Sequence, residues 1–202
     1  MGAVIARVLV LAALALVAGC GDDEPAAEPP GDPLVRELRE GGLVLVIRHA
    51  STDAEINRRE RLRSCVLQRN LTEAGRAQAR ALGESIRALR IPIGEVRSSP
   101  LCRARDTARL AFGRATLDED LVSPGVIGTE ADDERRARAL RAMVEDVPPA
   151  GENTVLVTHT GNIGAGLGEE TVAEGGLLVY GGSAGLVGRV PPDKWAELLR
   201  GG

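Results

Sequence analysis

The segment "LVLVIRHAST" extends from Leu43 to Thr52 and allows the central part of the fold to be predicted. Its first five residues are apolar, and such a run predicts a strand buried on both faces, as in a parallel sheet. The run stops at Arg48 and His49. The stretch "TVLVTHTGNI", from Thr154 to Ile163, repeats this pattern and contains His159, the only other histidine of the 202-residue chain. The two stretches therefore predict two buried strands that each end on a histidine.

Helical patterns lie between and after these two strands. Thr72 is a favourable helix N-cap, and the apolar spacing that follows it predicts a helix ending before Pro92. Residues 51–69 are polar and irregular, which predicts a long loop with one helical turn. The other predicted elements are a strand running into a turn over 93–100, helices over 101–112, 130–147 and 161–167, strands over 177–180 and 185–190, and a closing helix over 193–199. This alternation predicts an α/β fold, a three-layer α/β/α sandwich with a mostly parallel central sheet.

The first twenty residues have the pattern of a secretory signal peptide. One cation, Arg7, precedes an apolar stretch over 8–18, which is shorter than the about 20 residues needed to span a bilayer. The stretch closes on "VAGC" at 17–20, which resembles the bacterial lipobox, where cleavage precedes a cysteine that carries lipid. We therefore expect residues 1–20 to be a lipoprotein signal peptide and Cys20 to be lipidated. The alternative is an ordinary secreted protein, cleaved nearby, in which Cys20 has no such role.

The segment over 21–33 predicts a flexible acidic tether, because "GDDEPAAEPPGDP" has no large apolar residue to bury. The remaining residues, 34–202, have the size of one domain with its own core. The predicted location is outside the cytoplasm, with the membrane as a partner through the lipid anchor. A formal net charge of −4 argues against nucleic acid as a partner. The sequence does not predict an oligomeric state.

The cysteines other than Cys20 predict a disulfide. Cys65 and Cys102 form an even pair in an oxidising compartment. A bridge between them closes a loop of about 37 residues, which in the chain-entropy model stabilises a fold by about 3–4 kcal/mol. The alternative is a pair of buried free thiols. No C-x-x-C or H-x-x-H pair occurs in the sequence, so no structural metal site is expected.

The predicted topology brings basic residues to one edge of the sheet. In open α/β sheets ligands bind beyond the carboxyl ends of the strands, where Arg48, His49 and His159 are expected, with Arg103 one helical turn beyond the strand that ends near Ser99. Guanidinium groups match phosphate oxygens, and a neutral imidazole is a nucleophile toward phosphorus. Phosphoryl transfer mainly requires positioning and positive charge, which arginines can supply without a metal. The edge therefore predicts a site for an oxyanion.

Four segments in order carry a family resemblance. They are "VIRHA", "RNLTEAGRAQA", "SSPLCRARDTA" and "VTHTGN", which together extend over about residues 43–163. In order and spacing they resemble the motifs of the histidine phosphatase superfamily, the phosphoglycerate-mutase-like proteins. The resemblance implies that His49 is the nucleophile that becomes phosphohistidine, that His159 donates to the transferred group and that no cofactor is needed. The residues that it implies for substrate binding are Arg48, Arg103, His159, Asn70 and Thr72.

The proton donor has no clear motif. His159 is followed by Thr160 rather than an acidic residue, so the acid-phosphatase and phytase branch of the superfamily fits poorly. The acidic segment "LDEDLVSPG" supplies the candidate, Glu119, with Asp118 and Asp120 as alternatives.

The leading hypothesis is a lipid-anchored phosphatase that hydrolyses small phosphate monoesters without a metal. One alternative is a non-catalytic phosphate-binding lipoprotein, and another is a phosphohistidine-protein phosphatase, whose nitrogen leaving group needs less help from an acid. Substrate specificity is expected in the segments 51–69 and 117–129. A cluster of three glutamates is predicted to be surface only: Glu169, Glu170 and Glu174.

Overall fold

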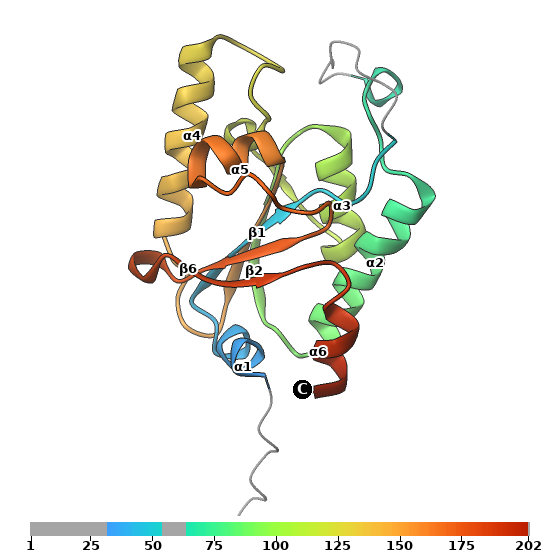
Figure 1. The fold of residues 1–202 in the computed structure, drawn as a ribbon, viewed down its shortest axis with the longest axis vertical. Helices are drawn as coiled ribbons and strands as arrows, with labels where there is room; N and C mark the ends of the chain where they lie inside the picture. Colours follow the sequence, from blue (N-terminus) through green and yellow to red (C-terminus); the bar gives the residue numbers. More distant parts are fainter. Residues whose placement is uncertain (1–31, 54–63, 202) are drawn as a thin grey trace, which may run out of the picture.

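Residues 32–53 and 64–201 are described by a computed structural model, in which strands and helices alternate along the chain (Figure 1). The elements in order are α1 (Pro33–Glu40), β1 (Leu43–Arg48), η1 (Cys65–Leu67), α2 (Glu73–Ala88), β2 (Ile93–Ser98), α3 (Cys102–Phe112), β3 (Thr116–Leu117), η2 (Glu119–Leu121), α4 (Glu130–Glu145), β4 (Asn153–Thr158), α5 (Thr160–Leu167), β5 (Leu177–Tyr180), η3 (Gly182–Ala184), β6 (Leu186–Val190) and α6 (Trp195–Gly201). The predicted signal peptide, with Cys20, and the tether up to residue 31 lie outside the described residues. Within the described part, no helix combines the length and the apolar character needed to cross a membrane.

The two strands that end on histidines are neighbours in the centre of a six-stranded sheet of order β3-β2-β4-β1-β5-β6. β1 pairs with β4 in parallel, and Arg48 lies opposite Thr158 at their carboxyl ends. The residue that follows each strand is a histidine, so this register places His49 and His159 side by side just beyond the carboxyl ends of β1 and β4. β2 and β3 extend the parallel part, whereas β5 and β6 are antiparallel. The predicted mostly parallel sheet is confirmed.

The two faces of the sheet are covered by different helices. Successive residues of β1 point to opposite faces, so Leu45 and Ile47 enter one apolar cluster and Val44 and Val46 the other. The first cluster contains residues of α1, α2, α3 and α6, and the second contains residues of α4 and α5. Figure 1 shows α4 and α5 on one side of the strands and α2 and α3 on the other. The predicted three-layer sandwich is thus confirmed.

The start of α2 is held against the loop that follows β1. Thr72 Oγ1 accepts a hydrogen bond from the Gly75 amide at 2.9 Å, as expected for an N-cap. A Cβ atom on Gly75 would lie 2.0 Å from the Ser51 carbonyl oxygen. Only glycine fits there, so this residue allows α2 to pack directly on the loop two positions after His49.

The first helix is a feature that the sequence pattern does not predict. α1 starts at Pro33, a favourable first helical position, and the Asp32 carboxylate accepts a hydrogen bond from the Leu34 amide at 2.9 Å. The helix buries Val35 and Leu38 in the core, where their exposed fractions are 1% and 0%. The folded domain therefore includes the end of the predicted tether.

Candidate active site

His49 leaves the end of β1 as a buried side chain with 2% of its surface exposed. Its backbone amide donates to the Thr158 carbonyl at 3.0 Å, and its ring Nδ1 lies 2.9 Å from the Ala50 carbonyl oxygen. Because a carbonyl oxygen only accepts, Nδ1 carries the proton, and the lone pair of the neutral ring is on Nε2. The Ala50 amide in turn donates to Thr107 Oγ1 at 2.9 Å. This chain of contacts fixes both the orientation and the tautomer of the imidazole.

His159 occupies the matching position after β4 and lies beside His49. The two ring centroids are 5.2 Å apart, with an angle of 54° between the ring planes. His159 Nε2 is 2.9 Å from the hydroxyl of Ser99, which follows β2. Three parallel strands therefore meet at this edge, and the structure brings the two predicted histidines together there.

Both imidazoles are neutral at pH 7. Burial lowers the pKa of His49 from 6.5 to about 3, because a charged ring would lose its hydration, and the neighbouring cations Arg103, Arg48 and Arg69 lower this pKa further. Burial and the same arginines also hold the pKa of His159 well below its usual value. A neutral His49 retains the lone pair that a nucleophile needs.

Three guanidinium groups surround the histidines. Arg103, in the first turn of α3, is buried with 6% of its surface exposed, and Arg48 is half-buried at the end of β1. Arg69, half-buried just before α2, acts electrostatically on both imidazoles and is a site residue that the sequence analysis did not single out. It lies inside the quoted motif "RNLTEAGRAQA", which was the available signal.

Several buried polar atoms at this edge lack hydrogen-bond partners within the described residues. They include Arg48 Nε, Arg69 Nε and His159 Nδ1. Burying such a group without a partner costs free energy, so unpaired polar atoms are uncommon in folded proteins and indicate a place for a ligand. Two guanidinium donors and an imidazole nitrogen suit an oxyanion.

Glu174 is not a simple surface residue, and that prediction was wrong. It follows α5 and immediately precedes the glycines that lead into β5. Its carboxylate pairs with Arg48 at 3.3 Å and with Arg69 at 3.4 Å, and only 24% of its side chain is exposed. The adjacent Gly175 amide donates to the carbonyl oxygens of Arg48 and His49, which fastens the segment to the end of β1.

The two predicted residues near α2 make mainly backbone contacts. Asn70 Nδ2 donates to the carbonyl oxygens of Cys65 at 2.6 Å and Gln68 at 3.0 Å. The Thr72 amide donates to the Ser51 carbonyl at 3.1 Å, in addition to the N-cap contact. In this structure both residues therefore hold the loops that shape the edge of the sheet.

The predicted disulfide is present. Cys65 in η1 is bonded to Cys102 at the start of α3, with their Cα atoms 5.7 Å apart. The Cys102 amide also donates to Gln68 Oε1 at 2.7 Å. The bridge thus fixes the segment carrying Arg69 to the helix turn that carries Arg103.

The acidic segment of η2 lies at the same edge, because the Asp118 amide donates to the Ser98 carbonyl at the end of β2. Asp118 pairs with Arg97, and Asp120 pairs with Arg135. Glu119 is exposed at the start of η2 and has no ion pair among the described residues. It is therefore the carboxylate of this segment that is free to meet a ligand.

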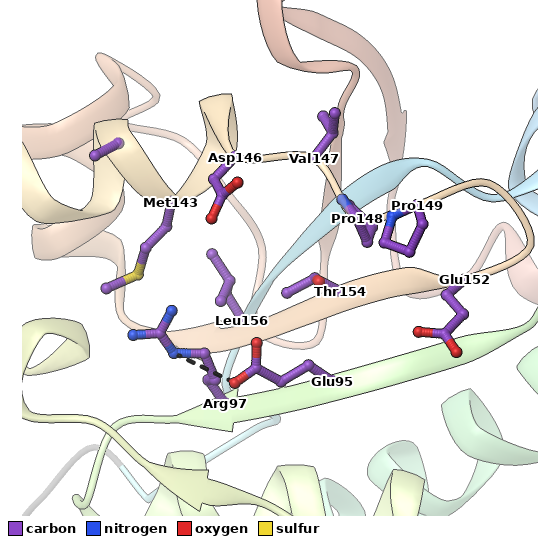
Figure 2. Close-up of a pocket in the computed structure, with 11 residues that line it drawn as sticks. Glu95, Arg97, Met143, Asp146, Val147, Pro148, Pro149, Glu152, Thr154 and Leu156 are labelled. Carbon is purple, nitrogen blue, oxygen red and sulfur yellow. Dashed lines mark ion pairs between the residues drawn. The ribbon is translucent and has the colours of Figure 1, made fainter.

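A separate hollow of about 550 Å³ lies on the α4 side of the sheet (Figure 2). Figure 2 shows Glu95 and Arg97 of β2 as an ion pair, with Met143 of α4 near them. The other lining residues are Ala142, Asp146, Val147, Pro148, Pro149, Glu152, Thr154 and Leu156. None of the candidate site residues lines this hollow.

Comparison with known proteins finds one matching family model. The sequence model of the histidine phosphatase superfamily (branch 1) matches residues 44–122, which include His49 and Arg103. No curated protein sequence matches the chain significantly.

Solved structures of similar fold include the protein histidine phosphatase SixA complexed with tungstate, with a TM-score of 0.54 and 15% identity over 75% of this chain and 98% of that one. Phosphoserine phosphatase from Entamoeba histolytica in complex with 3-phosphoglyceric acid has a TM-score of 0.53 and 18% identity over 73% and 95% of the two chains. TTHB049 from Thermus thermophilus has a TM-score of 0.52 and 23% identity over 74% and 99%. These likenesses establish the fold, and the match of the sequence model to residues 44–122 supports assignment to the histidine phosphatase superfamily.

Proposed function

We propose that this chain hydrolyses phosphate monoesters through a phosphohistidine on His49. The observation that carries the proposal is a buried, neutral imidazole, its lone pair on Nε2, with His159 at 5.2 Å and three guanidinium groups acting on both rings. Nucleophile and cations for the phosphoryl oxygens are thus within one site. The phosphoserine phosphatase of similar fold, described in complex with 3-phosphoglyceric acid, supports a small phosphorylated substrate.

The proposed reaction has two steps. His49 Nε2 attacks phosphorus, a P–N bond forms, and the bond between phosphorus and the leaving oxygen breaks. Arg48, Arg69, Arg103 and His159 stabilise the charge on the transferring group. Water then attacks phosphorus, the P–N bond breaks, and inorganic phosphate leaves with the neutral imidazole restored.

The leaving oxygen needs a proton in the first step. We assign this role to Glu119, because Asp118 and Asp120 are held in ion pairs with arginines. A Glu119→Gln variant should lose most activity toward an alkyl phosphate and little toward 4-nitrophenyl phosphate, whose leaving group is stable without a proton. Equal loss for both substrates would remove Glu119 from this role.

The nucleophile is tested with His49→Ala and 4-nitrophenyl phosphate. Hydrolysis should fall by at least about 10³-fold, as when a nucleophile is removed from an enzyme whose other groups remain. The unsubstituted protein should form an acid-labile phosphoenzyme that the variant does not form, and a chelator should leave turnover unchanged. Retained hydrolysis in His49→Ala would refute the nucleophile assignment. Tungstate binding with no hydrolysis of any phosphoester would instead favour the non-catalytic binding protein.

A second candidate is hydrolysis of phosphohistidine on another protein. It is favoured by the exposed position of Glu119, the carboxylate of η2 that has no ion pair among the described residues, because a nitrogen leaving group needs less acid help. The likeness to a protein histidine phosphatase also favours it. A phosphohistidine-containing peptide and an alkyl phosphate should be compared at equal concentration. A kcat/KM at least 100-fold higher for the peptide would favour this candidate over the monoesterase.

We also place the domain outside the cytoplasm, anchored by lipid on Cys20. The lipobox-like sequence supports this location, as does the disulfide between Cys65 and Cys102, since disulfides persist mainly in oxidising compartments. In cells fed a labelled fatty acid, the protein should carry label and sediment with membranes, and Cys20→Ala should do neither. A labelled Cys20→Ala protein would contradict the assignment.

A further inference from the structure

Glu174 accepts four hydrogen bonds from described residues at the edge of the proposed phosphate pocket. The Thr52 amide donates to Oε2 at 3.2 Å, and the Thr52 hydroxyl donates to Oε1 at 2.8 Å. Arg48 Nη2 and Arg69 Nη2 donate to Oε1 at 3.3 and 3.4 Å. The carboxylate therefore joins the end of β1, the loop that follows it and the segment before α2.

These contacts leave a defined part of each guanidinium group available. Arg48 donates through Nη1 to the Val172 carbonyl at 2.7 Å and through Nη2 to Glu174, while its buried Nε has no partner within residues 32–53 and 64–201. Arg69 likewise bonds Glu174 through Nη2, and its buried Nε has no partner in the described part of the chain. Glu174 thus orients both side chains, and each retains an Nε donor without a partner among the described residues.

The carboxylate also offsets repulsion among the cations. Burial is the largest cause of the lowered pKa of Arg48. The charge of Glu174 opposes this effect and raises the pKa, whereas the nearby cations Arg69 and Arg103 lower it further. Glu174 is thus the counter-charge that reduces the repulsion between Arg48 and Arg69 within the described residues.

Donation of a proton by Glu174 does not fit these contacts. Its two oxygens accept from an amide, a hydroxyl and two guanidinium groups, so both are already engaged with donors. Glu174 therefore acts on the reaction indirectly, by holding the side chains of Arg48 and Arg69 in position.

We propose that Glu174 is a positioning residue that holds Arg48 and Arg69 in the arrangement that binds the phosphoryl oxygens, an inference that rests on the proposed function. The same contacts set the specificity of the pocket for a tetrahedral oxyanion, since the two guanidinium donors are fixed relative to each other through one carboxylate.

The test measures tungstate binding to Glu174→Gln by calorimetry. Removal of a negative charge next to an anion site would by itself tighten binding, whereas loss of positioning weakens it. We expect the Kd for tungstate to rise at least tenfold, and kcat/KM for 4-nitrophenyl phosphate to fall by at least the same factor. A purely structural role would lower the thermal midpoint and the binding stoichiometry, but would leave the Kd of the folded fraction unchanged.

Two further variants complete the experiment. Glu170→Gln removes an exposed glutamate from the same segment and should leave the Kd within twofold. Thr52→Val keeps every charge but removes one hydrogen bond to Glu174. It should also raise the Kd for tungstate, by a smaller factor than Glu174→Gln does. If Glu174→Gln does not fold, the Kd of Thr52→Val tests the positioning role.

The outcomes separate the two proposals. An unchanged or lower Kd in Glu174→Gln overturns the positioning role and leaves the proposed function standing. Tungstate binding that depends on Glu174, in a protein that hydrolyses no phosphoester, overturns the proposed function alone. Absence of tungstate binding by the unsubstituted protein overturns both.

Discussion

Acid should destabilise this domain through His49. Its pKa is about 3 in the folded chain, against about 6.5 in an unfolded one. Between these values the unfolded chain binds a proton that the folded chain does not, so the free energy of unfolding rises with pH in this window. Stability from the neutral, buried ring is therefore fully present above about pH 6.5 and is lost as the pH falls toward 3.

The size of the loss follows from the shift. Linkage predicts that the free energy of unfolding falls by about 3 kcal/mol between pH 7 and pH 4. The loss reaches about 5 kcal/mol once the pH is below both the folded and the unfolded pKa of His49. The burial of His49 justifies a figure of this size, because solvent does not screen a side chain that is 2% exposed. The lowered pKa of His159 also reduces the free energy of unfolding in acid, both in the unsubstituted protein and in a His49 variant.

The assay is urea unfolding at pH 7 and pH 4 of the unsubstituted protein and of His49→Asn. Titration of carboxylates affects both proteins and cancels in the difference. The unsubstituted protein should lose about 3 kcal/mol more than the variant over this interval. Because the chain has two histidines, their ring proton resonances can also be followed directly by NMR. Equal losses in the two proteins, or a His49 ring that titrates near 6.5, would show that burial does not lower the pKa of His49 in the folded chain.

Three further substitutions test the contacts that hold the loops and helices around the site in place. Gly75→Ala places a Cβ 2.0 Å from the Ser51 carbonyl oxygen and should cost about 1–3 kcal/mol by thermal unfolding; an unchanged midpoint would show that the loop yields freely. Thr107→Val removes an acceptor for a buried amide and should cost about 1–3 kcal/mol and lower kcat; undiminished kcat would contradict its part in orienting the nucleophile. Replacing Cys65 and Cys102 by serine should cost about 3–4 kcal/mol in urea, and a reductant should then have no further effect.

Much of the architecture followed from local patterns. The continuous apolar runs predicted β1 and β4 because a strand covered on both faces needs apolar side chains throughout. Thr72 marked the start of α2 through its N-cap oxygen, and Gly113 marked the end of α3 because the chain turns there with a φ of 75°. The disulfide between Cys65 and Cys102 followed from counting cysteines once Cys20 was set aside.

The contacts of Glu174 had no such local signal. Its ion pair with Arg48 joins residues 126 positions apart, and its ion pair with Arg69 joins residues 105 positions apart. Both exist because β5 lies antiparallel beside β1, which brings the segment before β5 to the carboxyl end of β1. A glutamate in a polar, glycine-rich segment is otherwise typical of a solvated surface.

Local sequence patterns were enough to predict the strands, the helix caps, the cysteine pair and the two histidines at strand ends, because periodicity, capping and chemical type are properties of neighbouring residues. Contacts between distant residues were needed to show that Arg69 and Glu174 join the site, that the His49 lone pair is on Nε2, and that both imidazoles are neutral. These features depend on strand order and burial, which distant parts of the chain create together.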